Sequence, residues 1–460
     1  MKRFLSVLLA VCMIISCAGI ISGCKDSKEP KAVDLDGRVI KMVSWGTDTG
    51  GLYVDPEDKS ELGQLRLSRL KEYEEKYNCK FEFELMQAGD ILSKFTTAAL
   101  SGESIGDLIC MRSPWVYTAL NSELLLPLDE YFDFSKPQFS DFAKETCTVD
   151  GKVYGLSTET TNHVENALYF NKRIFDDLGL EYPYEMVKNK KWTTDVFEDY
   201  LKKATVVKNG ATEIYGMYGF THNGDGLAGF LDCFGAEFAH KTDKGYVSGI
   251  KDKQMTDALN FIRKNMYENK YIYNVSGEAS YTEAKTMFVE GKVAMLTNGI
   301  ATAMAGLKDE MTDDFGLVPL PLGPGQTEYS ICEMYENVWV MPASLEPTVA
   351  QAIANMITGI FEPSSDDEAE LEKELKRSIE GYFCDEESVD IAYDLLTKDG
   401  MKVYNHYTVG TADYRSIVGG QINEAIRGKT TVASAIGSVS TAWEMFLDIY
   451  NENNFGSAEE

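Results

Sequence analysis

Apolar and polar positions form alternating blocks over the first quarter of the chain. Residues 38–45, 80–86 and 107–111 carry short apolar or alternating runs, which are typical of strands. Between them, residues 63–78 space their apolar side chains as an amphipathic helix does, and residues 91–100 form a second helix. The order strand, helix, strand, helix, strand predicts a parallel sheet in an α/β fold. In such sheets, ligands bind beyond the carboxyl ends of the strands.

The pattern continues to the C-terminus. Residues 153–170 are extended and apolar, and Thr193 or Thr194 caps a helix that ends at Ala204. Residues 364–380 mix acidic residues with lysines, which predicts a solvated helix rather than an interaction site. Further helices are expected at residues 172–178, 253–269, 281–289, 347–361, 389–396, 417–427 and 432–453, and further strands at 293–296, 315–317 and 337–341. With 460 residues and no internal repeat, the chain has the length of two or three domains.

The N-terminus has the pattern of a lipoprotein signal peptide. Two basic residues precede an apolar stretch at residues 4–15, which is too short for a membrane span. The run Ile21-Ser22-Gly23-Cys24 resembles the lipobox of bacterial lipoproteins. We expect residues 1–23 to be removed, Cys24 to carry lipid and residues 24–37 to form a tether. An ordinary secretory signal or an uncleaved anchor is the alternative, and Cys17 is a weaker lipidation site.

Charge and cysteine usage narrow the function classes. The formal net charge of −29 argues against a nucleic-acid partner, because binding to phosphates requires a basic face. Beyond Cys24 the cysteines are scattered singly, with no CxxC pair, so we expect buried free thiols and no metal site. They are Cys79, Cys110, Cys147, Cys233, Cys332 and Cys384.

Motifs of hydrolytic enzymes are missing from the chain. Only four histidines are present, none lies in an HExxH motif, and no GxSxG elbow occurs. Carboxylates are abundant, so a secreted glycosidase is the alternative from another class, but no spacing marks two of them as a pair. We predict a protein that is not an enzyme and that uses no cofactor.

Several runs, in one order, resemble the family 1 extracellular solute-binding proteins of ABC importers, the group that includes maltose-binding protein. The runs are LLLPLDEY at 124–131, DGKVYGL at 150–156, ALYFNKRIFDDLGL at 167–180, FVEGKVAMLTNG at 288–299 and GLVPLPLG at 316–323. Shorter runs are AALSG at 98–102, YGF at 218–220 and GKTT at 428–431. The chain departs from the family pattern at Glu123, where Gly is usual, at Ser157, where Pro is usual, and at Trp192-Thr193, whose order is reversed.

The resemblance implies a two-lobed periplasmic-binding-protein-like (type II) α/β fold, with a hinge and an interlobe cleft. Projected onto this chain, it assigns residues 38–157 and 284–336 to lobe one. Residues 158–283 and 337–453 are assigned to lobe two, and residues 454–460 form a tail. Closure of the lobes on a solute would then distinguish the loaded protein from the empty one.

A sugar site needs aromatic rings that stack on the sugar and planar polar side chains that bond to its hydroxyls. We expect such residues at strand ends and at the crossovers between lobes. The candidates are Trp45, Asp48, Arg112, Trp115, Glu159, Asn162, Asn223, Asp225, Asn298, Tyr335, Trp339, Tyr414 and Arg415. Trp339 lies in an apolar run, so packing in the core is an equally good interpretation. Asp225 and Arg415 also suit a simple turn and a surface ion pair.

Together these features predict a monomeric, lipid-anchored solute-binding protein on the outer face of the bacterial cytoplasmic membrane. Its expected partners are a small solute of the sugar class, the permease subunits of an ABC importer, and the membrane through the lipid on Cys24. A peptide or another polar solute, or a sensory lipoprotein of the same fold, is the alternative.

Overall fold

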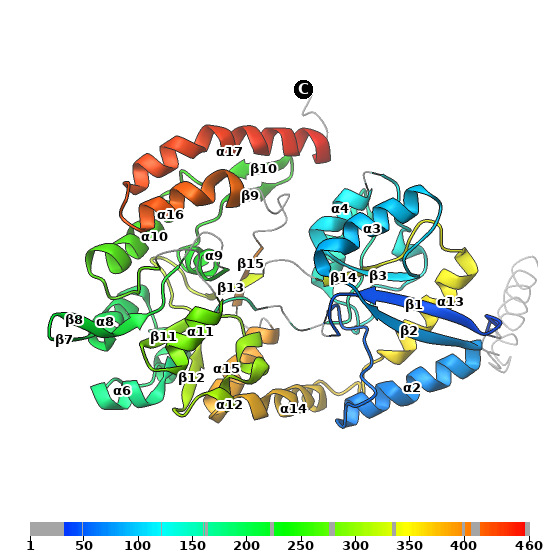
Figure 1. Ribbon diagram of the computed structural model, residues 1–460, viewed down its shortest axis with the longest axis horizontal. Helices are drawn as coiled ribbons and strands as arrows, with labels where there is room; N and C mark the ends of the chain where they lie inside the picture. The colour runs from blue at the N-terminus through cyan, green and yellow to red at the C-terminus, as the bar shows by residue number, and fades with distance from the viewer. Residues whose placement is uncertain are drawn as a thin grey trace, which may run out of the picture.

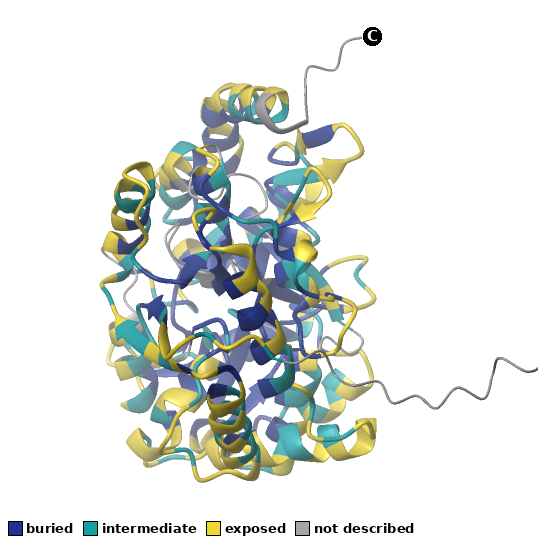
Figure 2. Ribbon diagram, turned by 90° about the vertical axis from the view of Figure 1, so that its right-hand side faces the viewer, coloured by how far each residue is buried: buried dark blue, intermediate teal, exposed yellow. Residues whose placement is uncertain are grey.

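The computed structural model describes residues 32–47, 49–120, 122–159, 161, 164–220, 225–275, 281–333, 337–397, 401–405 and 415–455. These residues form two α/β lobes that lie side by side (Figure 1). Each lobe has its own sheet and its own buried apolar clusters, and no cluster includes residues from both lobes. Figure 2, which views the molecule from the side of lobe one, shows exposed positions on the outer helices and buried positions inside. The predicted α/β class is confirmed.

Lobe one is built on a four-stranded sheet in the order β14-β3-β1-β2. The strands are β1 (Arg38–Ser44), β2 (Cys79–Leu85), β3 (Leu108–Arg112) and β14 (Asn337–Val340). β1 pairs in parallel with both β2 and β3, as the opening pattern predicts, and β14 is antiparallel to β3. The helices of this lobe are α2 (Glu61–Tyr77), α3 (Ala88–Leu100), α4 (Ser113–Leu120), α5 (Asp141–Thr146) and α13 (Pro347–Ile360).

Local sequence explains where α2 begins and ends. The Ser60 hydroxyl accepts a hydrogen bond from the Gly63 amide at 3.0 Å and thereby satisfies one free donor of the first turn. Asn78 ends the helix in the left-handed conformation, with φ of 48°. The chain then enters β2 directly, so a short, well-capped connection positions this strand beside β1.

Lobe two is built on a five-stranded sheet in the order β12-β6-β11-β8-β7. The strands are β6 (Ala167–Asn171), β7 (Val206–Lys208), β8 (Ala211–Met217), β11 (Val293–Asn298) and β12 (Phe315–Val318). The principal helices are α6 (Lys172–Leu178), α8 (Thr194–Ala204), α10 (Lys253–Arg263), α11 (Tyr281–Val289), α15 (Glu386–Thr397), α16 (Gly420–Ile426) and α17 (Val432–Phe455). All five residues of β6 are buried, which matches its place inside the sheet.

The remaining elements are short strands and helices. They are η1 (Leu128–Glu130), β4 (Thr148–Val149), β5 (Lys152–Val153), α7 (Tyr184–Lys188), α9 (Asp225–Asp232), β9 (Ala239–Thr242), β10 (Gly245–Ser248), η2 (Lys264–Glu268), η3 (Ala303–Leu307), α12 (Lys308–Glu310), β13 (Tyr329–Glu333), α14 (Glu368–Ile379), η4 (Glu380–Tyr382), β15 (Met401–Asn405) and η5 (Arg415–Gly419). β13 pairs with β15 next to the crossing segments, and β9 pairs with β10 beside α17 (Figure 1).

The predicted division into lobes needs a correction. Of the predicted lobe-one segment 284–336, the described residues 284–333 belong to lobe two, because β11 pairs with β8 and β6, and β12 pairs with β6. The segment 337–361 belongs to lobe one, since β14 pairs with β3 and α13 packs on α2. The chain therefore passes between the lobes after Leu156, between β13 and β14, and after α13 (Figure 1). Strand pairing partners are distant in sequence, and the apolar pattern does not reveal them.

Candidate binding site

Three predicted side chains meet at one edge of the lobe-one sheet. β1 and β3 are parallel neighbours, so their carboxyl ends lie together. Trp45 follows β1 directly, Arg112 is the last residue of β3, and Trp115 lies in the first turn of α4. Asn337, the first residue of β14, pairs in register with Arg112, so this edge is also where the chain crosses between lobes.

The three side chains form a cation–π cluster. The Trp45 and Trp115 ring centroids are 5.7 Å apart, with an interplanar angle of 63°. The Arg112 guanidinium carbon lies 5.9 Å from the Trp45 centroid and 5.3 Å from the Trp115 centroid. All three residues are half-buried, so the rings are held in place yet still present surface to solvent. Two indole faces and a planar donor group are the chemistry that stacks on a sugar ring and bonds to its hydroxyls.

The loop after Trp45 brings Glu159 to the same edge. Gly51, with φ of +70°, approaches the 158–159 backbone so closely that a Cβ would lie 2.9 Å from the Glu159 nitrogen. The Thr158 hydroxyl donates to the Gly51 carbonyl at 2.8 Å, and the Glu159 amide donates to the Ser157 hydroxyl at 3.0 Å. Glu159 is half-buried at this junction, where the first crossing begins.

Trp339 is a core residue rather than a ligand contact. It is fully buried, its indole nitrogen donates to the Thr49 carbonyl at 3.2 Å, and it packs edge-on against Phe83. A solute cannot reach it, and we remove it from the candidate site. Its function is to position the loop, since Gly50 lies against the indole with no room for a Cβ.

Lobe two contributes Asn298 at the end of β11. Asn298 pairs in register with Ala167, the first residue of β6 after the crossing from lobe one. The following residues contact the crossing too, since the Ile300 amide donates to the Val164 carbonyl at 3.1 Å. Asn298 is half-buried, and its side-chain oxygen accepts the Gly299 amide at 2.9 Å. The carboxamide nitrogen is thus oriented by its own turn.

Three further polar side chains near the crossings were not predicted from the sequence. The Asn166 Nδ2, Thr297 Oγ1 and Asn337 Oδ1 atoms are buried and have no hydrogen-bond partner in the described part of the chain. Buried polar atoms of this kind call for a partner. For Asn166, which is 0% exposed, that partner can only be a buried water, whereas Thr297 and Asn337 keep some exposure that a solute could reach. Asn166 and Asn337 each stand directly beside an apolar strand where a crossing ends. An asparagine next to an apolar strand can be seen in the sequence, and it could have marked these two positions as candidates.

The buried thiol of Cys110 lies beneath the lobe-one edge. Burial raises the pKa of the Cys110 thiol to about 12, although the Ser44 and Thr49 hydroxyls lower it by hydrogen bonding. Ser44 and Thr49 also hydrogen-bond to each other. This thiol therefore stays neutral and inert, and it supports the site as packing rather than as chemistry.

The lobes also meet at a second place, away from these strand ends in sequence. The Lys241 Nζ atom of β9 lies 3.9 Å from the Glu145 Oε1 atom of α5. Tyr117 of α4 is close enough to Tyr246 and Tyr450 of lobe two for these groups to help raise its pKa, for which burial is the main cause. Contact between the β9–β10 hairpin and lobe one is what a closing movement would make or break.

Other predicted residues lie outside the described residues. These are Cys24, Asp48, Asn162, Asn223, Tyr335 and Tyr414, and the side chains of Asp225 and Arg415. The backbone of Asp225 begins α9, and that of Arg415 begins η5.

Comparison with known proteins identifies relatives of this architecture. The family model described as bacterial extracellular solute-binding protein matches residues 64–359, which is more than half of the chain. No curated protein matches the chain in sequence. The resemblance inferred from the motifs is confirmed by the family match.

Solved structures show the same fold at low identity. An ABC substrate-binding protein from Listeria monocytogenes in complex with cycloalternan is 16% identical with a TM-score of 0.60, and the match covers 89% of this chain and 99% of that chain. A cyclo/maltodextrin-binding protein complexed with maltotetraose is 17% identical with a TM-score of 0.60, covering 92% and 98%. UgpB from Mycobacterium tuberculosis in complex with glycerophosphocholine is 14% identical with a TM-score of 0.61, covering 89% and 98%. The predicted periplasmic-binding-protein-like fold is thereby confirmed.

Proposed function

Because the chain belongs to the family of bacterial extracellular solute-binding proteins, we propose that it captures a carbohydrate between its lobes and delivers it to the permease of an ABC importer. The observation that carries the proposal is the cluster of Trp45, Arg112 and Trp115 at a crossing edge. Membership of this family also separates the chain from secreted hydrolases, since the family consists of binding proteins.

The sheet edges of the two lobes, where the chain crosses between them, suit different parts of a sugar. Indole faces pack on the C–H face of a pyranose ring, and the Arg112 guanidinium donates to hydroxyl oxygens in its plane. Asn298, Thr297 and Asn337 would then hydrogen-bond to the remaining hydroxyls. Solved relatives with oligosaccharides support the carbohydrate class, and the relative with glycerophosphocholine supplies the competing class, a phosphodiester.

Anchoring on the outer face of the membrane is part of the proposal. Within the described ranges, none of the helices has the length and apolar character to cross a bilayer. Cys24 and the rest of residues 1–31 lie outside those ranges, so lipidation is argued from the lipobox pattern alone. Replacement of Cys24 with Ala should release the protein from the membrane fraction into the medium. Incorporation of a labelled fatty acid should be seen in the native chain and lost in C24A, and equal incorporation by the two chains would contradict a lipid anchor at this residue.

A thermal-shift and calorimetry panel tests the solute. The panel contains mono- and oligosaccharides of glucose, mannose and galactose, together with glycerophosphocholine. A sugar at a concentration of 100 times its Kd should stabilise the native state by about 2.7 kcal/mol. Binding of glycerophosphocholine with no response to any sugar would replace the carbohydrate class with a phosphodiester. A panel with no binding would remove both.

A further inference from the structure

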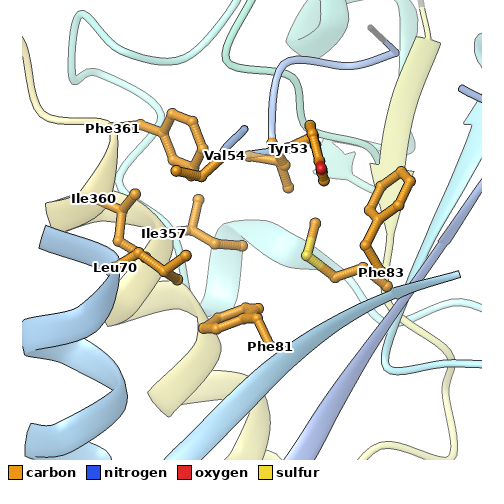
Figure 3. Close-up of a pocket in the computed structure, with 10 residues that line it drawn as sticks. Tyr53, Val54, Leu70, Phe81, Phe83, Ile357, Ile360 and Phe361 are labelled. Carbon is orange, nitrogen blue, oxygen red and sulfur yellow. The ribbon is translucent and has the colours of Figure 1, made fainter. Parts of the chain in front are cut away.

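Lobe one contains a second cavity that the proposed solute site does not use. It lies between β2, α2, α13 and the segment that follows Trp45, and its space is about 480 Å³ when the part that opens to solvent is included. Figure 3 shows Phe81, Leu70, Ile360 and Phe361 converging on this space, with Phe83 and Tyr53 at its other side. The walls are almost entirely apolar, which is the usual character of a pocket for a small organic ligand.

A polar chamber adjoins the apolar one. Its open space is about 490 Å³, and it shares Tyr53 and Val54 with the apolar chamber. Arg66, Asp55 and Asp58 line it. A ligand that spans both chambers would therefore have an apolar body and a polar end.

Arg66, which lines the polar chamber, has a buried nitrogen that lacks a hydrogen bond. Its Nε atom is buried without a hydrogen-bond partner, and its guanidinium carbon lies 5.1 Å from the Phe361 ring centroid. Burial lowers the pKa of this guanidinium, against smaller opposing effects of Glu374 and Asp58. A partly desolvated cation gains from an anion placed against it.

The nearby carboxylates of Asp58 and Glu374 interact with Arg66 through their charge, but each accepts hydrogen bonds from other groups. The Asp58 Oδ1 atom accepts the Ser60 amide at 2.8 Å, and the Asp55 Oδ1 atom accepts the Glu57 amide at 2.8 Å. Neither forms an ion pair with Arg66 in the described part of the chain. Arg69, one turn further along α2, differs, because it donates to the carbonyls of residues 360, 362 and 363.

We propose that the two chambers form a second binding site, for a small carboxylate with an aromatic or branched apolar body. The apolar body would pack among Phe81, Phe83 and Ile360, and the carboxylate would accept hydrogen bonds from Arg66. This site lies in lobe one alone, so it does not depend on the carbohydrate proposal.

Calorimetry on the purified full chain tests the site with two probes of equal ring and chain length. These are 3-phenylpropionate, which carries a carboxylate, and phenethylamine, which carries an ammonium group. Saturable binding is expected for 3-phenylpropionate, with phenethylamine at least about tenfold weaker. Arg66→Gln should weaken 3-phenylpropionate by about tenfold, while Arg69→Gln, the matched control on the same helix, leaves its affinity unchanged.

Two more variants separate this site from the solute site and from misfolding. Leu70→Trp fills the apolar chamber and should abolish probe binding, with a native circular dichroism spectrum and cooperative unfolding as evidence of a folded protein. Trp115→Ala should weaken the sugar and leave 3-phenylpropionate unaffected. The proposal is overturned if 3-phenylpropionate does not saturate, if phenethylamine binds more tightly, or if Arg66→Gln binds as the native chain does.

Discussion

The crossing edges of the two lobes carry different chemistry. Lobe one presents two indole rings around a guanidinium, held half-buried at the ends of two parallel strands. Lobe two presents amide and hydroxyl groups, with Asn298 and Thr297 at the end of β11. If the proposed site is right, lobe one would supply the stacking surface together with the Asn337 amide, and lobe two would supply hydrogen bonds alone. A solute would need both lobes to be bound tightly and specifically.

The sheets beneath these edges also differ. In lobe one, β1 pairs with the next two strands along the chain, β2 and β3, and only β14 comes from far away. In lobe two, β6 lies between β11 and β12, which come more than a hundred residues later in the chain. The candidate residues of lobe one therefore lie mostly at the ends of strands that are close in sequence, whereas those of lobe two lie on β11, which pairs with β6 from a distant part of the chain.

Trp339→Ala should have the largest effect, and on stability. Removal of a fully buried indole leaves a cavity in lobe one, and we expect the free energy of unfolding to fall by about 3–5 kcal/mol. Denaturant unfolding measures the change. Trp339→Phe, which keeps most of the volume, should lose less. If Trp339→Ala instead weakened sugar binding without a change in stability, the assignment to the core would be wrong.

Trp115→Ala should act mainly on binding. Loss of a stacking ring should weaken the sugar by roughly 1.5–3 kcal/mol, or about ten- to a hundredfold in Kd. Calorimetry measures the affinity, and Tyr382→Ala is a control that removes an aromatic ring, 37% exposed, outside the candidate site. Equal affinities for the two variants would remove Trp115 from the site and, with it, the stacking function of lobe one.

Asn298→Ala sharpens the contrast from the other lobe. One hydrogen bond to the solute is expected to be lost, which corresponds to about 1 kcal/mol, or roughly fivefold in Kd. Asn189→Ala is the matched control, because the Asn189 amide donates to the Glu185 carbonyl within its own helix region. A loss for Asn298→Ala as large as that for Trp115→Ala would mean that lobe two supplies more than hydrogen bonds.

Lys241→Ala should have the smallest effect. Its contact with Glu145 joins the lobes at an exposed position, with the side chains 60% and 75% accessible, so water screens it. We expect sugar affinity to fall by less than about threefold at low salt, with no difference at high salt. A larger loss that persists at high salt would show that the hairpin controls closure by contacts other than this ion pair.

Prediction from sequence succeeded where structure is local. The parallel arrangement of β1, β2 and β3 follows from strand and helix periods over 75 consecutive residues, 38–112, and the helix predicted at 63–78 is α2, Glu61–Tyr77. Trp45, Arg112 and Trp115 were found because residues just beyond parallel strands share one edge. The same reasoning selected Trp339. Its position along a strand did not reveal that Phe83 and the loop at Thr49 bury its side chain.

By itself, the sequence determined the α/β class, the family and the chemistry near each strand end, because periodicity and motif spacing are properties of neighbouring residues. Tertiary structure alone decided that β11 and β12 belong to lobe two and that Trp339 is buried. It also placed Asn166 and Asn337 next to the crossings, each with a buried polar atom that has no hydrogen-bond partner among the described residues. Those outcomes depend on hydrogen bonds and packing between segments far apart in the chain. Each segment's own pattern is compatible with several partners, and the partner is chosen only when the whole core is assembled.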